Sequence, residues 1–306
     1  RADWSSTAFS GIDDGLIQLV MERLAEATYA DLPDVATELV QTVTSRQDSF
    51  WSSEELVDWS VPTLAVKTLR QIGATDTDNA KTLTPTELAQ EYTQNDGWWQ
   101  IDSTYRQYID ATQSATVPYP HEAEVKQRVT DHYMSFLQEI NRPLANELSD
   151  DPSLGLSQTD FYEEFADPNK GTAIIICDGL RYELAEIIKK NLERSTDFEQ
   201  SIDAMSAAVP SVTEVGMAAH LPGTLGLSVE DDDLVVTSGG EVMSKKSDRV
   251  ERFNDAGFDI VTMDDVNSIS ITELSETDPV PRVVYSATID KLGESLDDDA
   301  AFSRVA

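Results

Sequence analysis

The sequence predicts an α/β protein in which a helical domain precedes a domain of alternating strands and helices. Apolar residues recur at helical spacing early in the chain, for example at Ile12, Leu16 and Leu24. The second half opens on an uninterrupted apolar run, 173–177, which is typical of a strand covered on both faces. We therefore expect a helical domain at 1–168 and an α/β domain at 169–306.

Start and stop signals place the helices of the first half. Pro33 and Thr84-Pro-Thr-Glu87 suit helix starts, and Gly73 suits a helix end. Pro62 can kink the helix that contains it, and Asn95-Asp-Gly97 can interrupt another. The expected helices are 12–30, 34–45, 52–72, 84–113 and 122–147.

Aromatic residues are frequent in this half, and two interpretations stay open. They could form a surface for a partner, but a helix-bundle core explains such residues more often. His121 and His132 lack partners at the spacing of metal ligands, so we expect both to be structural. The aromatic residues are Phe50, Trp51, Trp98, Trp99, Tyr105 and Tyr108.

The strand at 173–177 brings Asp178 to its carboxyl end, which is where open α/β sheets place their chemistry. A helix is expected directly afterwards, from Leu180 to Leu192. The alternative is an Asp-Gly turn in which Asp178 caps that helix. Further strands are expected at 231–240, 258–262 and 283–285, and a helix at 247–256.

The composition is strongly acidic. The chain has 306 residues, and 57 acids against 22 bases give a formal net charge of −35. Such a surface suits molar salt, where self-repulsion is screened within a few ångströms, so we expect a cytoplasmic protein of a halophile. No apolar run reaches the length of a membrane span, and no basic patch indicates a nucleic-acid binder. The single cysteine, Cys177, is expected to serve packing.

A second motif lies at Pro210-Ser-Val-Thr-Glu-Val-Gly-Met-Ala-Ala-His-Leu-Pro222. Ser211 and Glu214 match a capping box, which would open a helix at 212–220 and place Thr213 in its first turn. A hydroxyl there lies beside free amides that favour a phosphate, and a metal held by Asp178 would make it a nucleophile. The alternative is that Thr213 only helps to start a helix.

A third motif follows the strand at 283–285. Asp290 and Glu294 are one helical turn apart, and two carboxylates at this spacing can bind one divalent ion. The same spacing is also common on any exposed acidic helix.

Together and in this order, the three motifs resemble the PglZ family. This family is the phosphatase component of BREX phage-defence systems and is part of the alkaline phosphatase superfamily. The helical half agrees more loosely, through Arg46-x4-Trp51 and Trp98-Trp-Gln-Ile-Asp102-x2-Tyr-Arg106. The resemblance implies that 169–306 is the N-terminal part of an alkaline-phosphatase-like core.

The resemblance also implies roles for single residues. Asp178 matches the first metal-ligand aspartate, and Thr213 matches the metal-bound nucleophile that forms a covalent phospho-enzyme. Asp290 matches a ligand of the second metal, and Glu294 stands where the family usually has Asp. Two divalent ions, zinc by analogy, are implied. The superfamily's later Asp-His pair and further His have no counterpart in 291–306, so we expect a truncated core with little or no turnover.

The expected function is a metal-dependent phosphoryl-ester hydrolase that serves phage defence together with other defence proteins and acts away from membranes. Its substrate would be phosphorylated, and a diesterase acting on nucleic acid is one variant. The alternative is an assembly module of a defence complex with an incomplete metal site.

Overall fold

The structure is a computed structural model. It describes residues 10–49, 52, 54, 57–150, 157–170, 172–195, 199–262 and 281–295. The chain divides into two compact units. The first comprises 1–152, 182–191 and 293–306, and the second comprises 153–181 and 192–292. Residues 182–191, which follow the strand at 173–177, thus pack with the first unit.

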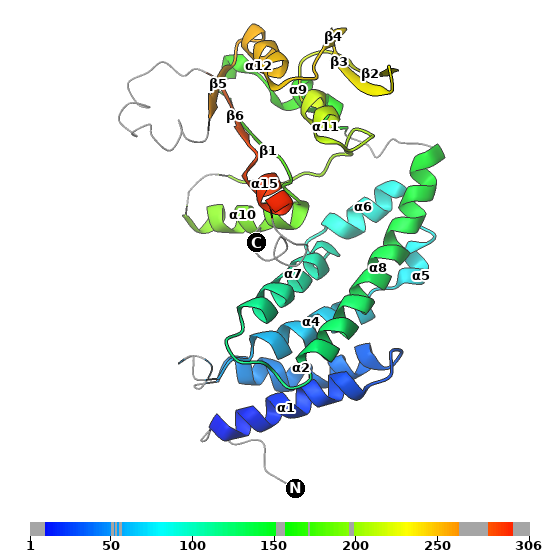
Figure 1. Cartoon of the computed structure of the whole chain (residues 1–306), viewed down its shortest axis with the longest axis vertical. Helices are drawn as coiled ribbons and strands as arrows, with labels where there is room; N and C mark the ends of the chain where they lie inside the picture. Colours follow the sequence, from blue (N-terminus) through cyan, green and yellow to red (C-terminus); the bar gives the residue numbers. More distant parts are fainter. Residues whose placement is uncertain are drawn as a thin grey trace. The chain divides into compact units, whose positions relative to one another are not determined.

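The first unit is helical (Figure 1). The expected helix at 84–113 is interrupted near Asn95-Asp-Gly97, and the capping box between Thr84 and Glu87 forms as predicted. Its helices are α1 (Ser10–Glu26), α2 (Leu32–Gln47), α4 (Ser60–Gly73), α5 (Thr77–Ala80), α6 (Pro85–Thr93), α7 (Trp99–Ser114), α8 (Glu122–Asp150) and most of α10 (Tyr182–Ser195).

One helix start was predicted wrongly. The helix expected from residue 52 begins at Ser60, with Trp59 as its N-cap. Pro62 falls in the first turn, where a missing backbone N–H costs nothing, so it marks the start of α4 rather than a kink. Residues 51, 53, 55 and 56 lie outside the described part of the chain.

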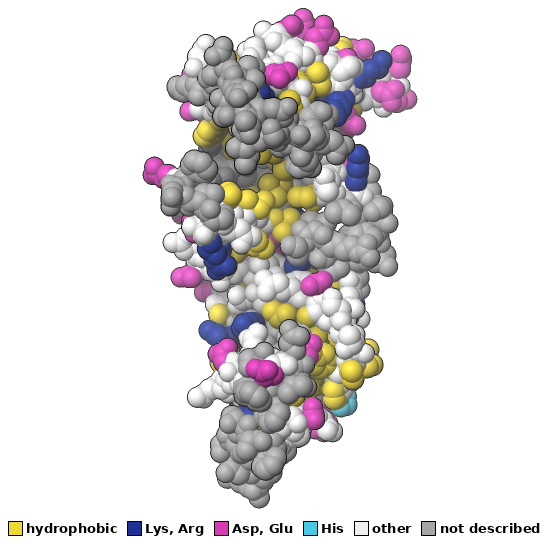
Figure 2. Space-filling model, turned by 90° about the vertical axis from the view of Figure 1, so that its left-hand side faces the viewer, with side chains coloured by type: hydrophobic (Ala, Val, Ile, Leu, Met, Phe, Trp, Pro, Cys, Tyr) yellow, Lys and Arg dark blue, Asp and Glu magenta, His cyan; other side chains and the backbone are white. Residues whose placement is uncertain are grey.

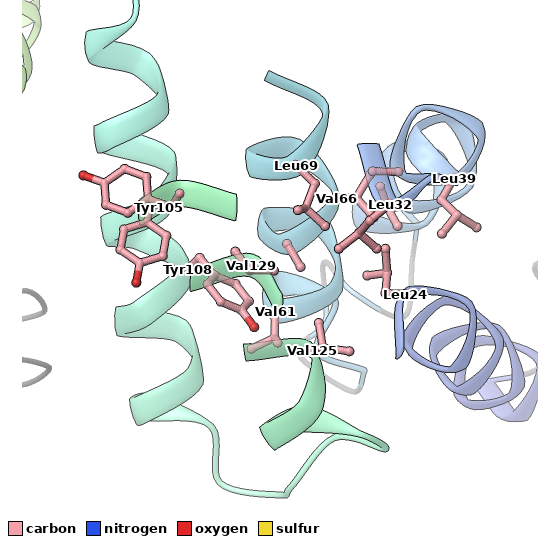
Figure 3. Packing of buried hydrophobic residues seen from close by; sticks show 14 of the residues in the cluster. Leu24, Leu32, Leu39, Val61, Val66, Leu69, Tyr105, Tyr108, Val125 and Val129 are labelled. Atoms are coloured by element: carbon pink, nitrogen blue, oxygen red, sulfur yellow. The ribbon is translucent and has the colours of Figure 1, made fainter. Parts of the chain in front are cut away.

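Helix α4 lies at the centre of this unit and packs against α2, α7 and α8. Its buried face carries Val61, Val66 and Leu69, and Figure 3 shows these side chains between those of the neighbouring helices. Tyr105 and Tyr108 are buried in the same cluster, as the bundle-core interpretation predicts. Phe50 and Trp51 lie outside the described residues.

A buried polar network ties α10 into the helical unit. Arg106 of α7 forms an ion pair with Glu183, and both side chains are almost fully buried. The hydroxyl of Tyr92 donates to Asp102 at 2.6 Å and lies 3.4 Å from the second Glu183 oxygen. Tyr182 donates to the carbonyl of Thr93 at 2.9 Å.

The second unit is a mixed α/β structure with two small sheets. One is parallel with strand order β1-β6-β5, and the other is antiparallel with order β2-β3-β4. Its elements are η1 (Gln158–Asp160), α9 (Phe161–Phe165), η2 (Pro168–Lys170), β1 (Ala173–Cys177), α11 (Thr213–Ala219), β2 (Leu225–Glu230), β3 (Asp233–Ser238), β4 (Glu241–Val242), α12 (Lys246–Asp255), β5 (Asp259–Thr262), β6 (Arg282–Ser286) and α15 (Thr288–Ser295).

Strand β1 is where the sequence predicts it, but its burial differs. Ile174 and Ile176 are buried in a cluster with Val283 of β6, whereas Ile175 is 64% exposed. The expectation of cover on both faces is therefore wrong for the described residues. An uninterrupted apolar run cannot distinguish the two cases, because β1 is the edge strand of a small sheet with one packed face.

Charge is dispersed over the surface. Figure 2 shows carboxylates spread over the described residues of the visible face, with separate Lys and Arg side chains among them. Among the helices that the structure describes, none has both the length and the apolar character needed to cross a membrane.

Candidate functional site

At the carboxyl ends of β1 and β6, the turn that contains Asp178 and Gly179 lies against the backbone of Asp290. The strands are parallel and in register, with Cys177 opposite Ser286. The Asp178 N–H continues this ladder by donating to the Ser286 carbonyl at 2.9 Å. The chain then enters α15, and Asp290 lies in the first turn of that helix. Both carboxylates are half-buried.

Gly179 allows this close approach. It occupies the third position of a turn in which the Leu180 N–H lies 3.5 Å from the Cys177 carbonyl, and its φ is +77°. A Cβ at this position would be 3.3 Å from the Asp290 backbone nitrogen. The turn after β1 therefore lies against the start of α15. Asp178 is not the N-cap of the following helix, because α10 begins only at Tyr182.

Thr213 is the first residue of α11, and its side chain is exposed. Val215 and Ala218 of this helix belong to the same hydrophobic cluster as Ile174 and Ile176 of β1. The helix thus shares a core with the strand that ends at Asp178. That the hydroxyl of Thr213 meets the two carboxylates stays a prediction.

The capping box predicted for α11 does not form. Val212, not Ser211, is the N-cap, and no side chain caps the helix. The Val212 N–H donates to the Pro210 carbonyl at 2.8 Å, and Val212 itself is extended. This tight turn delays the first helical residue to Thr213, which explains why the sequence pattern placed the helix start one residue early.

Glu294 lies on α15 one turn after Asp290, as predicted, but its side chain is outside the described part of the structure. Among the described residues, no group of three or more His, Cys, Asp and Glu side chains could hold a metal ion. Asp178 and Asp290 are the described carboxylates that the sequence predicts as ligands, and their role stays a prediction. Carboxylate oxygens are ligands that divalent cations accept, so these donors fit part of a divalent site.

His132, His220 and Cys177 lie in environments that indicate structural roles. His132 stacks on Tyr29 with ring centroids 3.9 Å apart, and burial lowers its pKa. His220 is the C-cap of α11 and is partly buried beside Gln158 and Phe161. Burial raises the pKa of the free Cys177 thiol, which disfavours the reactive thiolate and agrees with a packing role.

The second half of the chain is similar to a known protein family. Residues 161–301 match the family model described as the BREX system PglZ alkaline phosphatase-like domain. This part of the chain is therefore similar to the PglZ family. The match covers β1, α11, β6 and α15, and so every candidate site residue lies within the matched region.

A curated relative supports the same assignment. The alkaline phosphatase-like protein PglZ of Bacillus cereus (strain H3081.97) is 25% identical over 230 residues, which are 71% of this chain and 26% of that protein. The chain therefore spans about a quarter of the length of this PglZ relative. No solved structure matches the chain.

Proposed function

We propose that the PglZ domain contributes to a metal-dependent phosphoryl-ester hydrolase in which Thr213 is the nucleophile. The observation that carries the proposal is the adjacency of the Asp178 turn and Asp290 at the carboxyl edge of the parallel sheet. Ligand sites of open α/β sheets lie at this edge. The match to an alkaline phosphatase-like domain supports the reaction class.

The candidate residues would bind a divalent cation, each through a side-chain oxygen. Asp178 and Asp290 would hold a divalent cation, with Glu294 and the Thr213 hydroxyl as further oxygen ligands. When bound, the cation supplies positive charge that lowers the pKa of a hydroxyl and neutralises phosphoryl oxygens. Zinc is proposed by analogy with the superfamily, and manganese and magnesium are the alternatives that carboxylates also favour.

The proposed reaction has two displacements at phosphorus. In the first, the Thr213 oxygen bonds to phosphorus, the ester bond breaks and the leaving alcohol takes up the proton from Thr213. In the second, water breaks the bond between Thr213 and phosphorus, which releases phosphate and returns the proton to the hydroxyl. Because Thr213 is exposed at the start of α11, an ester group can approach it from solvent.

We further propose that the protein acts in the cytoplasm in a BREX-type phage-defence system, with other defence proteins as partners. The family description names this system. The substrate class is a phosphorylated molecule, either a monoester or a phosphodiester such as nucleic acid.

The test uses the whole protein that carries this chain, in molar salt, with zinc, manganese or magnesium. Phosphate release from a monoester and cleavage of a diester are compared between the wild type, Thr213→Ala and Asp178→Asn. We expect metal-dependent turnover that falls by at least about 10³-fold in both variants, since each removes a group required in the transition state. Equal rates in the wild type and Thr213→Ala would remove Thr213 from its role. An inactive wild type that still binds partner proteins would favour the assembly module.

A further inference from the structure

One side chain holds both ends of the segment that contains Thr213. Gln158, the first residue of η1, accepts a hydrogen bond from the Ala208 N–H at 3.0 Å through Oε1. Its Nε2 donates to the Gly216 carbonyl at 3.2 Å. The Gln158 backbone N–H also donates to the Ser206 carbonyl at 2.8 Å. Gln158 therefore contacts the chain before and after Thr213.

The Gln158 amide lies against α11 at Gly216. A Cβ at Gly216 would lie 3.6 Å from Gln158 Nε2, so the amide packs directly over the backbone of α11. The buried side chains of Val215 and Ala218 fix the neighbouring face of the helix in the hydrophobic cluster. Thr213, which is exposed, is thus placed by contacts made by other residues of its segment.

His220 completes the arrangement. Gln158 Nε2 lies 3.2 Å from His220 Nε2, and Phe161 packs edge-on against the imidazole with ring centroids 5.0 Å apart. Because an amide NH2 can only donate, His220 Nε2 must be the acceptor, which places the proton of the neutral ring on Nδ1. Burial lowers the pKa of His220 and so favours this neutral form.

We propose that Gln158 is a positioning residue for Thr213, and that neutral His220 accepts the second hydrogen bond of the Gln158 amide group. The amide has one acceptor facing the Ala208 N–H and a donor group facing the Gly216 carbonyl and the imidazole. A reversed amide would face the Ala208 N–H with a donor and the Gly216 carbonyl with an acceptor, so these two backbone groups fix its orientation. The inference rests on the proposed function, because positioning has a catalytic meaning only if Thr213 is the nucleophile.

Two substitutions separate the contacts. Gln158→Leu keeps a side chain of similar size and removes all three side-chain bonds. Gln158→Glu keeps the acceptor for Ala208 but cannot donate to Gly216, and its carboxylate would stabilise a protonated His220. Thr159→Val is the matched control, because Thr159 is the exposed neighbour of Gln158 in the same short helix.

The experiment measures three quantities in the whole protein: amide hydrogen exchange of 206–220, the imidazole nitrogen shifts of His220, and kcat with KM. In Gln158→Leu we expect faster exchange at 208–216, loss of the pure Nδ1–H tautomer, and a kcat reduced by about 10- to 100-fold with KM changed less. In Gln158→Glu we expect retained protection at Ala208 and an imidazole that protonates at higher pH. Thr159→Val should match the wild type.

The outcomes are distinguishable. Unchanged exchange and an unchanged His220 tautomer in Gln158→Leu would overturn the proposal. Altered exchange with wild-type kcat would also overturn it, since Gln158 would then be merely structural. If Gln158→Leu does not fold, Gln158→Glu decides by the same readouts. A wild type without phosphatase activity would contradict the proposed function, whereas the exchange and imidazole data would still decide whether Gln158 orders the Thr213 segment.

Discussion

Arg106 and Glu183 form an ion pair whose side chains are only 1% and 2% exposed. Arg106 lies in the helical half, whereas Glu183 follows the strand at 173–177. No local sequence pattern links the two residues. The hydroxyl of Tyr92 lies 3.4 Å from the second carboxylate oxygen of Glu183. The pair therefore fixes α10 within the helical unit, and both of its side chains are shielded from solvent.

Removing one partner of this pair should be costly. We expect Arg106→Met to lower the free energy of unfolding by about 3–5 kcal/mol, because Glu183 would keep a buried charge without its counter-ion. The double variant Arg106→Met/Glu183→Leu should recover most of that loss, since an apolar pair of similar volume replaces the two charges. Chemical denaturation of the single and double variants measures both effects.

The exposed ion pair between Arg23 and Glu38 provides the control. Arg23→Met should change the free energy of unfolding by less than about 1 kcal/mol, because solvent screens that pair. Similar losses in Arg23→Met and Arg106→Met would contradict the importance assigned to burial.

Gly179→Ala should destabilise the candidate site more than an ordinary glycine substitution does. The new Cβ would combine a positive φ with contacts at 3.2 Å to Ile289 and 3.3 Å to the Asp290 nitrogen. We expect a loss of about 1–3 kcal/mol and weaker binding of a divalent cation.

Gly240→Ala isolates the backbone part of this effect. Gly240 has a φ of +87° but open space around it, so alanine there should cost only about 1 kcal/mol. The excess loss in Gly179→Ala then measures packing of the turn against α15. Equal losses in the two variants would show that this contact is absent in solution.

Acid should destabilise the fold through His132 and His220. Burial lowers the pKa of both, so below a pH of about 6.5 the unfolded chain binds more protons than the folded chain. Stability contributed by these neutral rings is present above that pH and is lost as the pH falls, by at most about 1.4 kcal/mol per pH unit for each histidine. Denaturation at pH 7.5, 6.5 and 5.5 should give a shallower decline in His132→Gln/His220→Gln than in the wild type. Parallel declines would show that neither ring resists protonation.

Salt should stabilise the fold. With a formal net charge of −35, self-repulsion opposes the compact state unless ions screen it. We expect loss of structure below roughly 1 M KCl, followed by circular dichroism, and recovery when salt is restored. A fold that persists unchanged at low ionic strength would contradict the inference of a halophilic protein.

Local signals in the sequence were sufficient to predict the elements that carry Asp178 and Asp290. Strand β1 and the Asp178-Gly179 turn follow from an apolar run that ends in a turn pair, and the Thr84–Glu87 capping box acts within one helical turn. Asp290 could be placed on a helix because a short strand precedes it and residues at helical spacing follow it.

The contacts that sequence reasoning missed are mostly long-range. Gln158 forms hydrogen bonds with Ala208 and Gly216, which are about fifty residues away along the chain. No local sequence pattern predicts that a glutamine bonds to both. The partner of Glu183 lies in α7, far back in the chain. The late start of α11 is the exception, because it follows from a turn between Pro210 and Val212 that overrides the capping signal.

The path of the chain through the two compact units has a practical consequence for laboratory dissection. Because Tyr182–Asn191 belong to the first unit and the chain on either side of them belongs to the second, no single cut separates the two units. A clone limited to 161–301 would leave the buried carboxylate of Glu183 without Arg106. We therefore expect residues 161–301 to be best expressed together with the helices of the first unit.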